Sequence, residues 1–276
     1  MRLERFYTAK MSEVEALRQA AEQGGLPEIP DMRRPDFAAA LRTPSAKAPV
    51  AVIAEYKRAS PSLGVICESL EVEEASRQYA VAGARALSIL TEERYFHGKL
   101  SFLERAAAPD VYPSSPLPLL RKDFIFDPLQ VLATAATRAS ALLLIVRLTP
   151  NAAQLRHLRE LAEKSGIQVV VEVFDAQDLH TARESGARII QVNARDLDSL
   201  VVDRTACREL AMRYPPEGRE LWVAASGISR HEHLVQAADA GYQAVLAGSS
   251  LMKDGRPGAN LTTLLYDQNQ DNSHAN

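Results

Sequence analysis

From residue 50 onward, the chain alternates between short apolar runs and amphipathic stretches with the periodicity of helices. The apolar runs are rich in Val, Ile, Leu and Ala, which is typical of strands buried on both faces. Such strands alternating with helices indicate a parallel sheet covered by helices. The strands are predicted at residues 50–56, 86–90, 117–122, 141–147, 167–173, 188–193, 221–225 and 243–248.

Eight strand–helix units of this length predict a closed (β/α)8 barrel, the TIM barrel. An open doubly wound sheet is the alternative, but that fold usually has a glycine-rich phosphate loop after its first strand. Here the first strand ends in Glu55-Tyr56-Lys57 instead, which disfavours the open sheet. We therefore predict an α/β protein with a helical N-terminal extension over residues 1–48, including a helix at 11–23. A single barrel over 49–265 and a disordered polar tail over 266–276 are predicted to follow.

Composition limits the classes of function. The chain is 46% hydrophobic and 24% charged, with a net charge of −3, so no strong field for nucleic acid or a membrane surface is expected. No apolar run is long enough to cross a bilayer. Cys67 and Cys207 are far apart and His231 and His233 fall on different helix faces, so neither pair predicts a metal site. We expect a cytoplasmic protein that acts on a small molecule.

Polar and small residues stand where the predicted strands end. Glu55 and Lys57 have the parity of Ile53, so an apolar strand face ends in two charges. A surface ion pair would explain these two residues alone, but several later strands end in the same way. In a barrel of this kind, the carboxyl ends of the strands form the active site. The further candidates at these ends are Ser88, Lys122, Glu172, Asn193, Ser226, Gly227, Gly248 and Ser249.

Two lysines and two glutamates in one apolar mouth are suited to general acid–base catalysis. The Gly and Ser residues after the last two strands offer backbone N–H groups to a phosphate, although ordinary turns would also use them. Together these patterns predict an enzyme that acts on a phosphorylated, sugar-like compound.

Several segments are similar to those of one enzyme family, in the same order and on the same predicted strands. The chain resembles the indole-3-glycerol phosphate synthases of tryptophan biosynthesis over most of its length. The matching segments are AEYKRASPS, LSILTEERYFHG, LLRKDFIFDPLQ, VVVEV, VNARDL, ASGI and LAGSSLM. The resemblance implies a carbon–carbon lyase that needs no cofactor and no metal. Its substrate would be 1-(2-carboxyphenylamino)-1-deoxyribulose 5-phosphate, and its products indole-3-glycerol phosphate, CO2 and water.

The resemblance also implies a role for each candidate. Lys122 would be the general acid toward the ribulose carbonyl, Lys57 would hold the substrate carboxylate or act as a second acid, and Glu172 would serve dehydration. Glu55 and Asn193 would orient the lysines and the substrate hydroxyls. The substrate-binding set would be Ser226, Gly227, Gly248 and Ser249 at the phosphate with Ser60 nearby, Phe96 and Phe124 at the aromatic ring, Arg195 at the rim, and Ser88. A monomer or weak homodimer is expected, with contact to other enzymes of the pathway.

Two residues depart from the family pattern. Ala225 stands where the family has Glu before Ser-Gly-Ile, and Gln191 stands where it usually has Gly. We hypothesise that the Gln191 amide fills the space, or takes over the hydrogen bonds, that the missing carboxylate leaves. Two alternatives to the synthase stay open: another enzyme on the same fold, such as an aldolase forming a Schiff base through Lys122 or a sugar-phosphate isomerase, and a weakly active or non-catalytic paralogue, or one for a substituted substrate.

Overall fold

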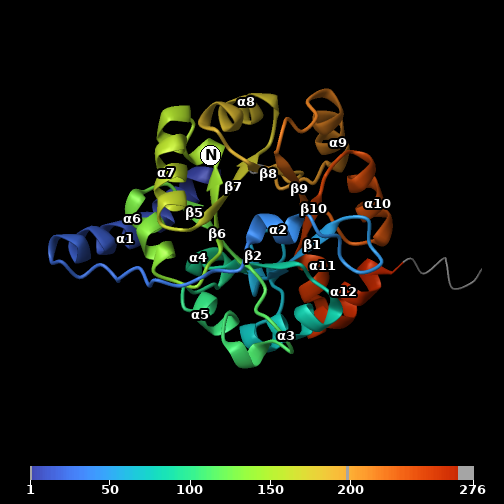
Figure 1. The fold of residues 1–276 in the computed structure, drawn as a ribbon, viewed down its shortest axis with the longest axis horizontal. Helices are drawn as coiled ribbons and strands as arrows, with labels where there is room; N and C mark the ends of the chain where they lie inside the picture. Colours follow the sequence, from blue (N-terminus) through green and yellow to red (C-terminus); the bar gives the residue numbers. More distant parts are fainter. Residues whose placement is uncertain (1, 197–198, 267–276) are drawn as a thin grey trace, which may run out of the picture.

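A computed structural model describes residues 2–196 and 199–266 of the chain. Its parallel strands close into an eight-membered barrel surrounded by helices (Figure 1), which confirms the predicted fold and excludes the open sheet. Around the barrel the strands are β1 (Ala51–Tyr56), β4 (Ala86–Leu90), β5 (Leu119–Ile125), β6 (Ala141–Ile145), β7 (Gln168–Val173), β8 (Ile189–Asn193), β9 (Leu221–Ala225) and β10 (Ala244–Ala247). Strand β10 pairs with β1 and closes the ring.

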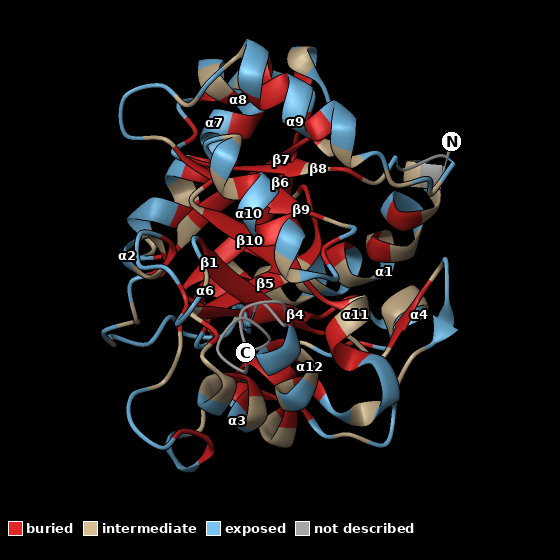
Figure 2. Ribbon diagram, turned by 90° about the vertical axis from the view of Figure 1, so that its right-hand side faces the viewer, coloured by how far each residue is buried: buried red, intermediate tan, exposed pale blue. Residues whose placement is uncertain are grey.

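Helices cover the outside of the barrel, and their buried residues face the strands (Figure 2). The longer ones are α3 (Val72–Ala82), α6 (Pro128–Ala135), α7 (Ala152–Lys164), α8 (Ala176–Ser185), α9 (Arg204–Arg213), α10 (His231–Asp239) and α12 (Pro257–Leu265). Shorter ones are α4 (Glu93–Phe96), α5 (Phe102–Ala106), α11 (Ser249–Met252) and the 3-10 turns η1 (Pro109–Val111), η2 (Val146–Leu148) and η3 (Lys253–Gly255). None of the helices in the described ranges is long and apolar enough to cross a membrane.

Alternate residues of each strand fill two apolar layers, as the period of two requires. Ile53, Leu120 and Val170 belong to the layer inside the barrel, whereas Val52 and Trp222 belong to the layer between strands and helices. Helix α2 (Phe37–Leu41) packs on β1 and β4, and its Phe37 and Leu41 are fully buried in the inner layer. This helix therefore covers the amino ends of the strands and leaves the carboxyl ends for a site.

The N-terminal helix α1 (Arg2–Glu22) begins nine residues before the start predicted at residue 11. It packs on α6 and β5, and Figure 1 shows it extending beside α6. Phe6, Lys10 and Val14 are spaced by four residues and are all buried, so they form the face that contacts the barrel. Because the middle member of this stripe is a lysine, apolar periodicity alone did not indicate the first nine residues of the helix.

The carboxyl ends of two strands differ from prediction by more than one residue. Strand β5 continues to Ile125 rather than ending at Lys122, because its register with β6 shifts between Arg121 and Ile125. Strand β6 ends at Ile145 rather than residue 147, where the turn η2 begins. A short hairpin of β2 (Ala59–Ser60) and β3 (Gly64–Val65) follows β1 and was not predicted. The domain limits at 48 and 265 stay predictions, and the predicted disordered tail lies outside the described residues apart from residue 266.

Candidate active site

A cavity opens at the carboxyl ends of the strands, with about 860 Å³ of empty space that is partly open to solvent. The structure brings most of the predicted site residues to its wall, from strands on opposite sides of the barrel. The predicted residues that line it are Glu55, Lys57, Ser60, Phe96, Lys122, Phe124, Glu172, Asn193, Arg195, Ser226 and Ser249. Phe6, Asp123, Gln191 and Ala225 also line it.

One side of the cavity is organised around the carboxylate of Glu172 on β7. Its Oε2 accepts a hydrogen bond from Lys122 Nζ on β5 at 3.3 Å. The same oxygen accepts a short hydrogen bond from Gln191 Nε2 on β8. Glu172 and Gln191 are fully or almost fully buried, whereas the Lys122 side chain is 19% exposed. Lys122 is therefore the member of this group that can approach a ligand most freely.

A second lysine–glutamate pair lies at the end of β1. Lys57 Nζ contacts Glu55 Oε1 at 2.7 Å, and Ser88 Oγ on β4 donates to Glu55 Oε2 at 3.2 Å. Ser88 is fully buried and is not among the cavity-lining residues. The predicted place of Ser88 in the substrate-binding set stays untested, but its contact in the structure is with Glu55.

Asn193 organises the rim between β8 and β9. Its Oδ1 accepts hydrogen bonds from Arg195 N at 3.0 Å and from Ser226 Oγ at 2.8 Å. Arg195 in turn donates from its guanidinium to Leu200 O at 2.9 Å. Burial lowers the pKa of the Arg195 guanidinium from its ordinary value, against the opposing effect of Glu55.

Beyond this rim lies a polar recess with about 620 Å³ of empty space. Its wall includes Ser226, Gly227, Gly248, Ser249 and Arg195. Gly227 has φ +74, and a side chain there would approach Val202 Cγ1 to 2.7 Å, so glycine is needed at this position. At Gly248, a Cβ would lie only 3.0 Å from the Cβ of Glu55. The two glycines thus let backbone groups approach this recess closely.

An aromatic wall closes the cavity near β4 and β5. Phe6 of α1 stacks on Phe124 with ring centroids 4.2 Å apart, and Phe96 lies 6.2 Å from both rings. Phe96 and Phe124 were predicted to form this wall, but Phe6 was missed. The signal that could have found it is its spacing of four residues from Lys10 on the same helix face.

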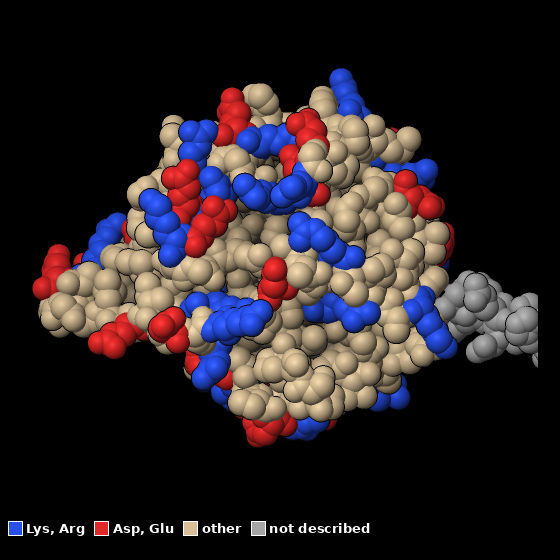
Figure 3. All heavy atoms as spheres, in the orientation of Figure 1, with Lys and Arg blue, Asp and Glu red and all other residues tan. Residues whose placement is uncertain are grey.

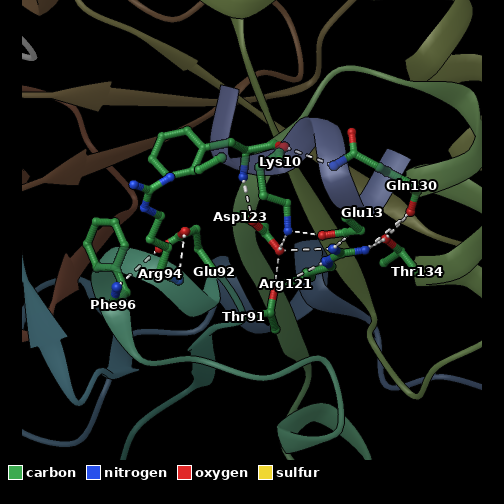
Figure 4. A network of polar contacts seen from close by, with 12 residues as sticks. Lys10, Glu13, Thr91, Glu92, Arg94, Phe96, Arg121, Asp123, Gln130 and Thr134 are labelled. Carbon is green, nitrogen blue, oxygen red and sulfur yellow. Dashed lines mark hydrogen bonds and ion pairs between the residues drawn. The ribbon is translucent and has the colours of Figure 1, made fainter. Parts of the chain in front are cut away.

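Behind the wall, buried charges join α1 to β5 (Figure 4). Asp123 Oδ2 accepts hydrogen bonds from Lys10 Nζ at 3.0 Å, Arg121 Nη2 at 2.9 Å and Thr91 Oγ1 at 2.5 Å. Arg121 also contacts Glu13 at 2.9 Å. Desolvation alone would raise the pKa of Asp123, but the charges of Arg121 and Lys10 outweigh it and lower that pKa to about 2. This network fixes the backbone on both sides of Lys122.

Acidic and basic side chains are interspersed over the face drawn in Figure 3. Within residues 2–196 and 199–266, no group of three or more His, Cys, Asp or Glu side chains is arranged to hold a metal ion.

The sequence is similar to one known protein family over nearly its whole length. The family model described as indole-3-glycerol phosphate synthase matches residues 3–264. The chain belongs to the indole-3-glycerol phosphate synthase family. A protein of that name from Roseiflexus castenholzii is 44% identical over 224 residues, covering 79% of this chain and 80% of its own length. Another from Roseiflexus sp. is 42% identical over 253 residues, covering 91% and 93%.

The similarity to solved structures extends to the fold alone. A crystal structure of 3-hexulose-6-phosphate synthase superimposes with a TM-score of 0.59 at 15% identity, covering 78% of this chain and 98% of that one. A structure titled native KDPGal has a TM-score of 0.51 at 20% identity, covering 78% and 90%. Both likenesses are below the level at which activity could be transferred.

Proposed function

We propose that this chain catalyses the decarboxylating ring closure of 1-(2-carboxyphenylamino)-1-deoxyribulose 5-phosphate to indole-3-glycerol phosphate. Family membership supports this reaction, and one structural observation fits it best. Two lysine–glutamate pairs, Lys122–Glu172 and Lys57–Glu55, face one cavity between an aromatic wall and a glycine-lined recess. A substrate with an aromatic ring at one end and a phosphate at the other matches that order.

The reaction needs proton transfers at defined places. Ring closure joins the carboxylate-bearing ring carbon to the ribulose carbonyl carbon, and the carbonyl oxygen takes a proton to become a hydroxyl group. Loss of CO2 then restores the aromatic ring. The hydroxyl group then leaves as water after a second protonation. A base removes one proton from the neighbouring CH2 carbon, which is bonded to nitrogen, so that a double bond forms between the two carbons.

Lys122 is the proposed proton donor to the carbonyl oxygen, because it lines the cavity and its ammonium group is hydrogen-bonded to the buried Glu172. A positioned cation also stabilises the negative charge that develops on that oxygen. Glu172 is buried beside Lys122 and is the proposed acid–base group for loss of water. Lys57, which contacts Glu55 at 2.7 Å, is the proposed group that binds the departing carboxylate.

The ends of the substrate would be held by the two other walls. Backbone N–H groups at Gly227, Gly248 and Ser249, with the Ser226 hydroxyl and Arg195, would bind the phosphate. Phe6, Phe96 and Phe124 would pack against the aromatic ring. We further propose a cytoplasmic monomer or weak homodimer that contacts other enzymes of tryptophan synthesis.

One observation favours a second candidate, a weakly active paralogue. Ala225 offers only a methyl group to the cavity wall next to Asn193, where the family pattern has a carboxylate. The assay is the fluorescence of indole-3-glycerol phosphate, measured with the native chain, Lys122→Ala and Ala225→Glu. Native turnover that is lost in Lys122→Ala supports the synthase, and turnover that is present only in Ala225→Glu supports the paralogue. Circular dichroism of each variant provides the folding control.

A further inference from the structure

Gln191 is a buried polar residue with an unusual imbalance in its hydrogen bonds. It is fully buried on β8, where its Cα pairs with that of Glu172 on β7. Its Nε2 donates to Glu172 Oε2, but its Oε1 has no hydrogen-bond partner among the described residues. A buried acceptor left without a partner is unfavourable, so a purely structural role would be better served by an apolar side chain.

The orientation of the Gln191 amide is set by its neighbour. Rotating the amide by half a turn would place Oε1 against Glu172 Oε2, so two acceptors would face each other. The donor must therefore point at the carboxylate, and the unpaired Oε1 is the consequence. Glu172 is the only acidic residue on β6, β7, β8 and β9, so no second carboxylate on these strands can share its contacts.

Three strands converge on one oxygen atom. Lys122 from β5 and Gln191 from β8 both donate to Glu172 Oε2 on β7. Without Gln191, the carboxylate would keep one polar partner among the described residues, Lys122 at 3.3 Å, because the Ala225 methyl group on β9 offers no hydrogen bond. A single long contact leaves a side chain free to rotate, whereas two donors on one oxygen fix both its position and the direction of its second oxygen.

From this geometry we infer that Gln191 is a positioning residue, which holds the Glu172 carboxylate so that Lys122 and Glu172 keep one fixed arrangement. Its role in turnover rests on the proposed function. Gln191 belongs to the cavity wall, but its side chain is fully buried and its amide N–H is directed at Glu172. It acts through Glu172 and supports the chemical step rather than substrate binding.

The test compares Gln191→Met, which keeps the length of the side chain but cannot donate, with Gln191→Glu, which nearly keeps its shape. The expected result for Gln191→Met is a fall in kcat of about tenfold to a hundredfold, the range known for hydrogen-bond partners that orient the ligands of a metal site. KM should change by less than about threefold, because the substrate contacts remain. Unchanged kcat in a folded Gln191→Met would overturn the inference, as would a rise in KM with kcat intact.

Gln191→Glu adds a readout that a structural role would not change. In this variant, an ionised carboxylate at position 191 repels Glu172, whereas the protonated carboxyl group donates an O–H in place of the amide N–H. The charged groups that line the same cavity are Glu172 and Lys122, with Glu55, Lys57, Asp123 and Arg195 also on its wall. The kcat of Gln191→Glu relative to the native chain should therefore rise as pH falls, and a constant ratio would contradict the proposed contact.

Crystal structures of the native chain and Gln191→Met separate this inference from the proposed function. If the native chain makes no indole-3-glycerol phosphate, the proposed function fails, but the positioning role is still tested. In Gln191→Met the Glu172 carboxylate should leave hydrogen-bond distance of Lys122 Nζ. A carboxylate that stays in place would overturn the inference whatever the activity. If Gln191→Met does not fold, the pH dependence of Gln191→Glu decides.

Discussion

Asp123→Asn removes the central charge of the network that joins α1 to β5. The pKa of Asp123 falls from 3.8 to about 2 in the folded chain. Since one pKa unit corresponds to about 1.4 kcal/mol, ionised Asp123 stabilises the folded state by about 2.5 kcal/mol near neutral pH. The substitution also leaves Lys10 and Arg121 buried with less compensation, and removing one partner of a buried pair costs about 3–5 kcal/mol. We expect a loss within that second range.

The assay is urea unfolding followed by circular dichroism at pH 7. Glu15→Gln is the matched control, because it removes an α1 carboxylate whose contact with Arg18 is 4.0 Å long and largely exposed. That control should cost less than about 1 kcal/mol. A loss for Asp123→Asn no larger than the control would refute the argument that these charges stabilise the fold.

The pH dependence of the same measurement gives an independent check. Because the folded-state pKa of Asp123 is lowered, its contribution is fully present above the unfolded value of 3.8 and disappears as pH falls through about 2. Between pH 5 and pH 2, the native chain should therefore lose stability more steeply than Asp123→Asn. Parallel curves would mean that Asp123 titrates normally in the folded chain.

Two further substitutions test other walls of the site. Gly248→Ala places a methyl group about 3.0 Å from the Cβ of Glu55, so it should shift Glu55, raise KM and cost about 1–3 kcal/mol in urea unfolding. Phe6→Ala removes a ring that is 3% exposed, so it should cost about 3 kcal/mol and raise KM without changing the pH profile of kcat. Wild-type KM for either variant would show that the altered wall does not contact the substrate.

The sequence was sufficient for the barrel because each strand is nearly continuous in apolar residues and most have a polar or small residue at or near the carboxyl end. In a parallel barrel all carboxyl ends meet on one face, so strand order need not be known to predict that Lys57, Lys122 and Glu172 share a cavity. This reasoning holds even for β5, whose end was misplaced by three residues. The side chain of Lys122 still reaches the cavity, because the pairing of β5 with β4 is regular up to that residue.

The sequence was insufficient where a residue's environment depends on a distant segment. Phe6 and Lys10 belong to a helix face whose middle position is charged, and the lysine there pairs with the buried Asp123 of a distant strand. Likewise, the inward parity of Gln191 was visible, but its pairing with Glu172 depends on the register of two neighbouring strands. A periodic pattern predicts single helices and strands, but it does not predict the contacts between elements that are far apart in sequence.

Strand β5 explains why the N-terminal helix belongs with the barrel. Lys122 and Asp123 both line the cavity, and the buried side chains of Asp123 and the adjacent Arg121 form ion pairs with Lys10 and Glu13 of α1. Without Lys10 and Glu13, two of the charges next to Lys122 would lose partners inside the protein, which is unfavourable. The extension and the site are therefore connected through consecutive residues of one strand. This connection agrees with a family match that begins at residue 3, within α1, rather than at the first barrel strand.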